Sequence, residues 1–85
     1  MSDAFEVEHR WKEQVFYREG ENVFLFDGGW GVTPRALYVP PAADWDAATP
    51  PWMHGRRDEI VARLAQTGDR IVEGPYRPWH PGRKY

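Results

Sequence analysis

Hydrophobic and charged residues alternate near the start of the chain. Over residues 5–12 the odd-numbered positions are mostly apolar or aromatic, and the even-numbered positions are all charged. This period of two is typical of a half-buried β-strand with one face in water. Residues 14–18 and 23–27 are two further β-prone runs. Glu19-Gly20-Glu21-Asn22 lies between them and supplies turn residues, so these two runs are expected to form a hairpin.

The strand pattern is interrupted after the third run. Gly28-Gly29-Trp30-Gly31 predicts a bulge or a tight bend. Val32-Thr33 can continue the strand beyond this bend. Residues 36–39 predict a fourth strand, which the following proline pair stops. A fifth short strand is expected over residues 69–73, where it can pair with the edge of the sheet after a helix crosses over.

The segment between the fourth and fifth strands starts irregularly. Residues 40–51 contain four prolines and several alanines, and they predict a long ordered loop with room for one helical turn from Asp44. The main helix is expected over residues 50–66, because Thr49 is a suitable N-terminal cap and Pro50 suits the first helical position.

A stripe of apolar residues supports this helix. On a helical wheel its members fall within about 40° of each other. Gly55 weakens the first turn, so the stable part of the helix can begin only near Arg56. Gly68 is expected to end it. The stripe consists of Met53, Ile60 and Leu64.

These elements predict one small α+β domain that covers residues 1–85. Its core is an antiparallel sheet of four to five strands with one main helix packed on one face. Residues 74–85 hold three prolines and cannot form a helix. They predict an extended Pro-rich arm, for which Tyr76 and Trp79 favour partial docking on the core.

Composition narrows the class of protein. The chain has 85 residues and no cysteine, so neither disulfides nor thiolate metal sites are available to it. Its start lacks the basic residues and the apolar run of a signal peptide. No stretch approaches the length of a membrane span. A cytoplasmic protein without membrane contact is therefore expected.

Charge is unevenly distributed along the chain. Residues 1–46 carry nine acidic and four basic side chains, whereas residues 47–85 carry four acidic and seven basic ones. The formal net charge is −2. The two halves either complement each other within the fold, or they create a dipolar surface that steers a charged partner.

Aromatic residues make up 15% of the chain and suggest a binding role. Trp, Tyr and Arg are the residue types that anchor interfaces. The alternative is that the rings only seal the core. The best interpretation is a small non-catalytic binding or accessory protein for a protein or small-molecule ligand, without a cofactor or metal. Its expected contact residues are Trp30, Tyr38, Trp45, Trp52, Arg56 and Arg57.

Other functions stay open at this stage. Asp44, Asp46 and His54 are the residues for a small acid/base or metal-assisted enzyme, although capping and turn formation also explain the two aspartates. A weak single-stranded nucleic-acid binder would use Arg56, Arg57 and the C-terminal arm. The pI of about 5.9 disfavours nucleic acid. A homodimer through an exposed sheet edge is a further possibility.

Overall fold

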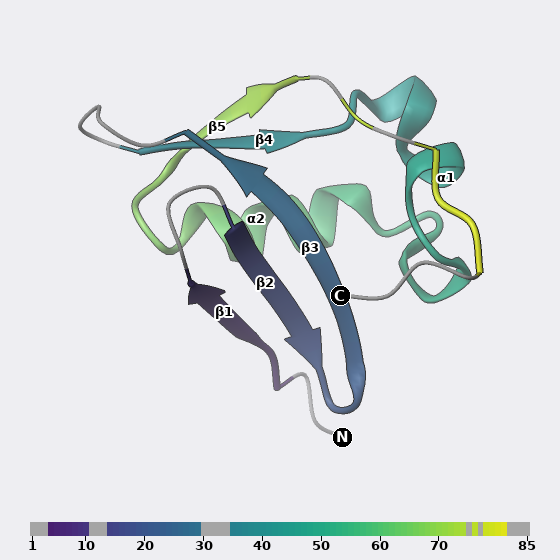
Figure 1. The fold of residues 1–85 in the computed structure, drawn as a ribbon, viewed down its shortest axis with the longest axis horizontal. Helices are drawn as coiled ribbons and strands as arrows, with labels where there is room; N and C mark the ends of the chain where they lie inside the picture. The colour runs from purple at the N-terminus through teal and green to yellow at the C-terminus, as the bar shows by residue number, and fades with distance from the viewer. Residues whose placement is uncertain (1–3, 11–13, 30–34, 75, 77, 82–85) are drawn as a thin grey trace.

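The chain forms a small α+β fold (Figure 1). The computed structural model describes residues 4–10, 14–29, 35–74, 76 and 78–81. Within these residues there are five strands, two α-helices and two 3-10 turns. In chain order they are β1 (Glu6–His9), β2 (Gln14–Glu19), β3 (Asn22–Gly28), β4 (Ala36–Val39), η1 (Ala42–Asp44), α1 (Trp45–Ala48), η2 (Pro51–Met53), α2 (Arg57–Ala65) and β5 (Arg70–Glu73).

The five strands form one mixed sheet in the order β1-β2-β3-β4-β5. The first three pairings are antiparallel, but β5 runs parallel to β4. The prediction of a purely antiparallel sheet is therefore wrong for the last pair. The chain leaves β4, passes through both helices and returns to the same end of the sheet, and such a crossover joins parallel strands. The Arg70 amide starts the ladder by donating to the Arg35 carbonyl at 2.8 Å.

The hairpin of β2 and β3 is confirmed. Glu19 pairs with Asn22 at its end, and Gly20 adopts a φ of 61° in the turn between them. Strand β1 is shorter than the predicted run of 5–12, since it ends at His9. The last part of that run and the predicted continuation at Val32-Thr33 lie outside the described residues.

The predicted helix over 50–66 is wrong in its first half. Residues Pro51–Met53 form only the 3-10 turn η2, and α2 begins at Arg57. Gly55 has a φ of 72°, which is left-handed backbone that breaks a helix. Thr49 does not cap the helix, because its hydroxyl donates to the Trp45 carbonyl at 2.7 Å. The weak first turn expected at Gly55 is thus a full interruption.

The segment before this break is more ordered than a loop. The predicted helical turn near Asp44 is present as η1 followed by the one-turn helix α1, which starts at Trp45. The short helix α1 is explained by burial, because its residues Trp45 and Ala48 are both buried. A single turn is enough to point these two side chains inward.

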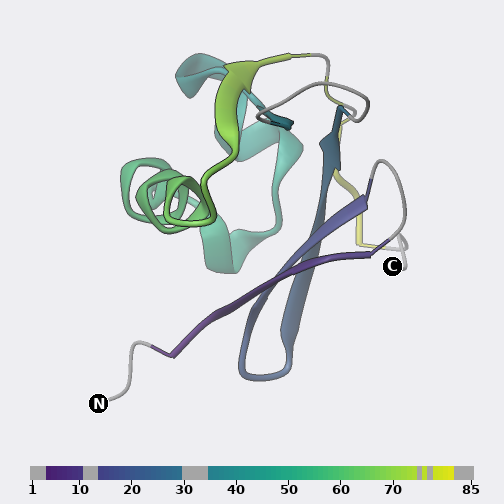
Figure 2. The same cartoon turned by 90° about the vertical axis from the view of Figure 1, so that its left-hand side faces the viewer.

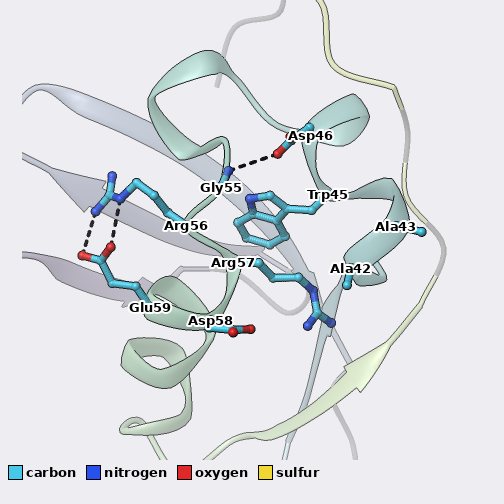
Figure 3. Close-up of a pocket in the computed structure, with 9 residues that line it drawn as sticks. All are labelled: Ala42, Ala43, Trp45, Asp46, Gly55, Arg56, Arg57, Asp58 and Glu59. Carbon is cyan, nitrogen blue, oxygen red and sulfur yellow. Dashed lines mark hydrogen bonds and ion pairs between the residues drawn. The ribbon is translucent and has the colours of Figure 1, made fainter.

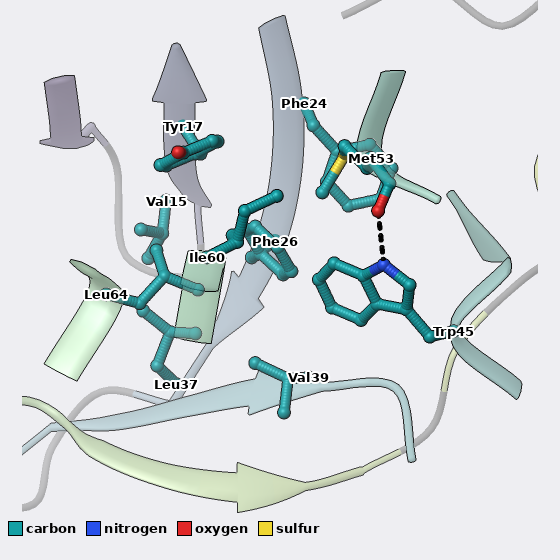
Figure 4. Close-up of a cluster of buried hydrophobic side chains, with 10 residues drawn as sticks. All are labelled: Val15, Tyr17, Phe24, Phe26, Leu37, Val39, Trp45, Met53, Ile60 and Leu64. Atoms are coloured by element: carbon teal, nitrogen blue, oxygen red, sulfur yellow. Dashed lines mark hydrogen bonds between the residues drawn. The ribbon is translucent and has the colours of Figure 1, made fainter. Parts of the chain in front are cut away.

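The core joins the strands to both helices (Figure 4). Ile60 and Leu64 of α2 are fully buried in one cluster with side chains of β2, β3 and β4. That α2 packs across one face of the sheet stays a prediction. The cluster consists of Val15, Tyr17, Phe24, Phe26, Leu37, Val39, Trp45, Met53, Ile60 and Leu64.

The C-terminal arm contacts the segment around α1. The Trp79 amide donates to the Ala47 carbonyl at 3.0 Å, and the Trp79 ring packs partly buried against the core cluster. Tyr76 is 39% exposed, and its hydroxyl is hydrogen-bonded to Asp44, which raises its pKa. The arm boundaries at 74–85 stay a prediction, because part of this range lies outside the described residues.

Candidate functional site

A pocket of about 470 Å³ opens where η1 and α1 face the start of α2 (Figure 3). It exists because the chain changes direction at Gly55, which turns α2 back toward the segment 42–46. The Gly55 amide donates to a carboxylate oxygen of Asp46 at 3.2 Å and ties the two sides together. The lining residues are Ala42, Ala43, Trp45, Asp46, Gly55, Arg56, Arg57, Asp58 and Glu59.

Trp45 forms the inner wall of this pocket, but it is mainly a core residue. Its side chain is 2% exposed, and its ring stacks on Phe26 with 6.2 Å between centroids. The indole nitrogen donates to the Met53 carbonyl at 2.7 Å, so the polar atom of the ring is satisfied inside the protein (Figure 4). For Trp45, the alternative that the ring seals the core is the one that the burial supports.

Arg56 has no donor left for a ligand. A guanidinium carries five N–H groups, and Arg56 makes five hydrogen bonds to protein acceptors. Two go to Glu19 at 3.0 and 2.7 Å. Two go to Glu59 at 3.1 and 3.0 Å, as Figure 3 shows. The last goes to the Trp52 carbonyl at 2.9 Å. Arg56 therefore links α2 to β2 rather than presenting a free charge.

Glu19 is the centre of a charged network that we call the Glu19 network; it consists of Tyr17, Glu19, Arg56, Glu59 and Arg63. Glu19 accepts hydrogen bonds from both arginines and from the Tyr17 hydroxyl. Arg63 also pairs with Glu59 at 3.0 Å. Each charge in this network thus has an opposite charge within hydrogen-bond distance.

The network shifts the pKa values of its members. Burial opposes ionisation of Glu19, but the hydrogen bonds from Arg56 and Tyr17 outweigh it together and lower the pKa of this carboxyl. The hydrogen bond from Arg56 lowers the pKa of Glu59. Burial, together with the hydrogen bond to Glu19, raises the pKa of Tyr17 to about 12. At neutral pH both glutamates are charged and Tyr17 is neutral.

Arg57 is only partly used by the fold. Its Nε donates to the Pro40 carbonyl at 3.0 Å and one terminal nitrogen donates to Glu73 at 3.2 Å. These bonds hold the start of α2 against the ends of β4 and β5. In Figure 3 the guanidinium points toward Ala42 across the pocket. Of its five N–H groups, three have no acceptor in the described part of the chain.

Asp58 is the functional candidate that the sequence pattern did not indicate. Its carboxylate has no hydrogen bond and no ion pair within the residues that the structure describes. Asp46 has one bonded oxygen, which accepts from Gly55. In sequence, an acid in the first turn of a helix is explained by the helix dipole alone. Nothing in the pattern therefore distinguishes Asp58 from an ordinary helix-stabilising residue.

Two of the remaining expected contact residues, Tyr38 and Trp52, are not among the residues that line the pocket. Trp52 is half-buried and stacks on Tyr17 with 6.2 Å between centroids and 10° between planes. Tyr38 is half-buried, and Gly74 passes so close to its ring that a Cβ there would lie 2.6 Å from the ring. Trp30 lies outside the described residues. The structure thus places Trp45, Arg56 and Arg57 around one pocket, whereas Trp52 contacts Arg56 through its carbonyl without lining the pocket.

The residues considered for an enzyme bind different partners. The His54 Nε2 lies 2.9 Å from the Thr49 carbonyl. Asp46 accepts from the Gly55 amide, and Asp44 is hydrogen-bonded to Tyr76. Across residues 4–10, 14–29, 35–74, 76 and 78–81, no three His, Asp or Glu side chains gather in a way that could hold a metal ion. This arrangement offers no support for shared acid/base or metal chemistry by Asp44, Asp46 and His54.

Comparison with known proteins adds no further constraint. No protein-family model, curated protein or solved structure matches the chain. Neither helix in the described segments has the length and apolar character that crossing a membrane requires. Any function of the pocket therefore has to be proposed from its own geometry.

Proposed function

We propose that this chain is a small non-catalytic binding or accessory protein, and that the pocket between η1, α1 and α2 is its partner surface. The observation that carries the proposal is that three of the expected contact residues, Trp45, Arg56 and Arg57, line the same pocket. Its volume falls within the range of about 300–1,000 Å³ that is typical of ligand sites. The partner is a protein or a small ligand, as the composition already suggested.

The lining residues have different roles in this proposal. Trp45 and Arg56 form the rigid wall, because their polar atoms are satisfied by the protein itself. Arg57 and Asp58 contact the partner, because they retain unpaired polar groups. We infer further that α2 packs across one face of the sheet, held by Ile60 and by the Glu19 network. This packing keeps the pocket preformed.

The proposal is tested by filling the pocket without touching the core. Ala42 is exposed and lines the pocket, so Ala42→Trp occupies the space at little expected loss of stability. Ala62→Trp is the matched control, since Ala62 is also exposed but does not line the pocket. Both variants and the wild type are used as bait for cross-linking and affinity capture from the source cells.

The expected result is a partner that wild type and Ala62→Trp capture and that Ala42→Trp loses. Unfolding curves of both variants establish that they are folded. Equal capture by all three proteins removes the pocket as the partner surface. Homodimerisation through β1 or β5, the two edge strands, is measured on the same samples by sedimentation and stays a prediction until then.

A further inference from the structure

The outer edge of β1 is open in the described part of the chain. At the end of the β1–β2 ladder the Arg10 amide donates to the Gln14 carbonyl at 3.0 Å. Hydrogen-bonded and non-hydrogen-bonded pairs alternate along an antiparallel ladder, so the N–H and C=O groups of Val7 and His9 point away from β2. In Figure 2 no described helix or strand lies in front of β1 on this side. These two residues therefore leave backbone groups that a further strand can bind.

The opposite edge of the sheet, β5, is less suited to such pairing. Its chain continues into Pro75, which has no N–H group to donate. Proline at an edge strand is one way in which proteins prevent further strand pairing. The side chain of Glu73 in β5 is also held within the fold, by Arg57 at 3.2 Å. Of the two edges, β1 is the one that can accept another strand.

The side chains of β1 determine what kind of strand fits there. Glu6, Glu8 and Arg10 lie on the side of the sheet away from the core cluster, because Val7 alternates with them and packs against that cluster. Glu8 is paired, since it accepts from Arg10 at 3.1 Å and from Arg18 at 2.6 Å. Glu6 has no hydrogen bond or ion pair within the described residues. Arg10 uses two of its five side-chain N–H groups there. An acid at one end of β1 and a base at the other thus retain binding capacity.

A second copy of β1 carries the complementary charges. With a two-fold axis at Glu8, Glu6 of one protomer lies opposite Arg10 of its partner, and the reverse pair forms at the same time. Val7 of one strand then lies opposite His9 of the other, which joins the outward backbone groups. The two Glu8 side chains meet at the axis, but each is balanced by two arginines of its own chain. Charged side chains on an edge oppose an arbitrary strand and favour one with matching charges.

We propose that the chain forms a two-fold homodimer in which β1 of one protomer pairs antiparallel with β1 of the other, so that two five-stranded sheets join into one. The contacts are the ladder between Val7 and His9 and the two ion pairs between Glu6 and Arg10. Because one short strand from each protomer gives a small contact, the dimer is weak and forms with rising concentration. This inference assigns the edge and the register of a homodimer, and it does not depend on the pocket between η1, α1 and α2.

Sedimentation of the full chain from micromolar to millimolar concentration tests the dimer. Glu6→Arg places arginine opposite arginine, and Arg10→Glu places glutamate opposite glutamate. Each change is expected to weaken dimerisation by about tenfold or more, because it replaces two attractive pairs by two repulsive ones. The double variant Glu6→Arg/Arg10→Glu restores opposite charges in this register. Its dissociation constant is expected to lie within about threefold of the wild type.

Two further variants separate the edge from the rest of the surface. Glu21→Arg reverses an exposed acid in the turn between β2 and β3 and is expected to leave dimerisation unchanged. Val7→Pro removes an outward N–H group and leaves the β1–β2 ladder intact, so it is expected to abolish the dimer. Denaturation curves establish that each variant is folded.

The outcomes separate this inference from the proposed function. A wild type that stays monomeric at millimolar concentration overturns it. A dimer that neither single charge reversal weakens forms through another surface and overturns it as well, and so does a double variant that fails to dimerise. Ala42→Trp is expected to dimerise like the wild type, and loss of the dimer in this variant would assign self-association to the pocket. Loss of partner capture alone concerns only the proposed function.

Discussion

The start of α2 has charged side chains in two different situations. In the Glu19 network every charge has an opposite partner, and Arg56 uses all its donors within the protein. At the pocket, Asp58 has no partner in the described residues, although it is only two positions further along the chain. The difference shows that the fold uses the charges of one short stretch differently, since Arg56 is fully paired and Asp58 is left unpaired in the described residues.

Helical geometry explains how neighbouring residues come to differ. Residues about three, four and seven positions apart share one side of a helix. Arg56, Glu59 and Arg63 have this spacing; the two arginines pair with Glu19 of β2, and Glu59 pairs with both arginines. Arg57 and Asp58 are rotated away from this side by about 100° per residue and do not join the network, although Arg56 and Glu59 line the pocket together with them. One turn of helix thus supports the fold on one side and a surface on the other.

The largest expected effect tests whether Trp45, which lines the pocket from inside, belongs to the hydrophobic core. Trp45→Ala removes a fully buried ring, and we expect the free energy of unfolding to fall by about 3–5 kcal/mol. Because a fall of this size can unfold a small domain, Trp45→Phe is the companion variant. It loses the hydrogen bond to Met53 and is expected to cost about 1–2 kcal/mol. Chemical denaturation measures the free energy of unfolding of both variants. Losses below about 0.5 kcal/mol would contradict the assignment of Trp45 to the core.

The next largest effect is expected in the Glu19 network. Glu19→Gln removes the charge shared by Arg56 and Arg63, and we expect a loss of about 2 kcal/mol, since the two guanidiniums are then incompletely paired at a mostly covered site. Glu21→Gln, at an exposed position of the adjacent turn, is the control and is expected to change stability by less than about 0.5 kcal/mol. Equal losses in the two variants would contradict the special role of the network.

Acid pH offers a way to weaken the same network without mutation. The folded state lowers the pKa of Glu19 and Glu59 below their ordinary value of 4.5. Their contribution to stability is therefore complete above that value, and it is lost as the pH falls through the pKa values of the folded state. Urea denaturation between pH 7 and pH 3 is expected to show this fall in wild type and a smaller one in Glu19→Gln. Parallel profiles of the two proteins would argue against the pairing.

The smallest effect is expected at the pocket. Asp58→Asn removes a carboxylate with no ion pair in the described residues, so only its favourable interaction with the helix dipole is lost. We expect a change of about 0.3–1 kcal/mol, measured by the same denaturation experiment. A loss as large as that of Glu19→Gln would show that Asp58 stabilises the fold, and the contrast between the two regions would disappear.

The strands were predictable because their signals are local. The hairpin turn at Gly20 and the apolar run of β4 require only neighbouring residues, and both lie where the pattern placed them. The interruption at Gly55 was visible in the sequence only as a weak first turn. In the structure its positive φ is accompanied by a hydrogen bond from its amide to Asp46, nine residues earlier, and a local pattern does not reveal such a contact. The direction of β5 depends on the whole crossover, so the pattern did not reveal it.

The site was less predictable than the fold for a similar reason. Trp45 and Arg56 are residue types that are common at interfaces, but the groups that each contacts within the fold decide its role. Arg56 is bound by Glu19, which lies 37 positions away in sequence. Asp58 was not singled out, because the absence of a partner is a property of the assembled structure. A binding residue and a structural residue of the same type look alike until the fold is known.

The parallel pairing of β4 and β5 also bears on how the chain assembles. Strands β1 to β4 are neighbours in both sequence and sheet, so each new pairing closes only a short loop. Strand β5 reaches β4 only after some thirty intervening residues, from Val39 to Arg70, have turned back, and such distant contacts form slowly because loop closure costs chain entropy. We therefore expect the meander to appear early in refolding and the pairing of β5 with β4 to be completed in the final step.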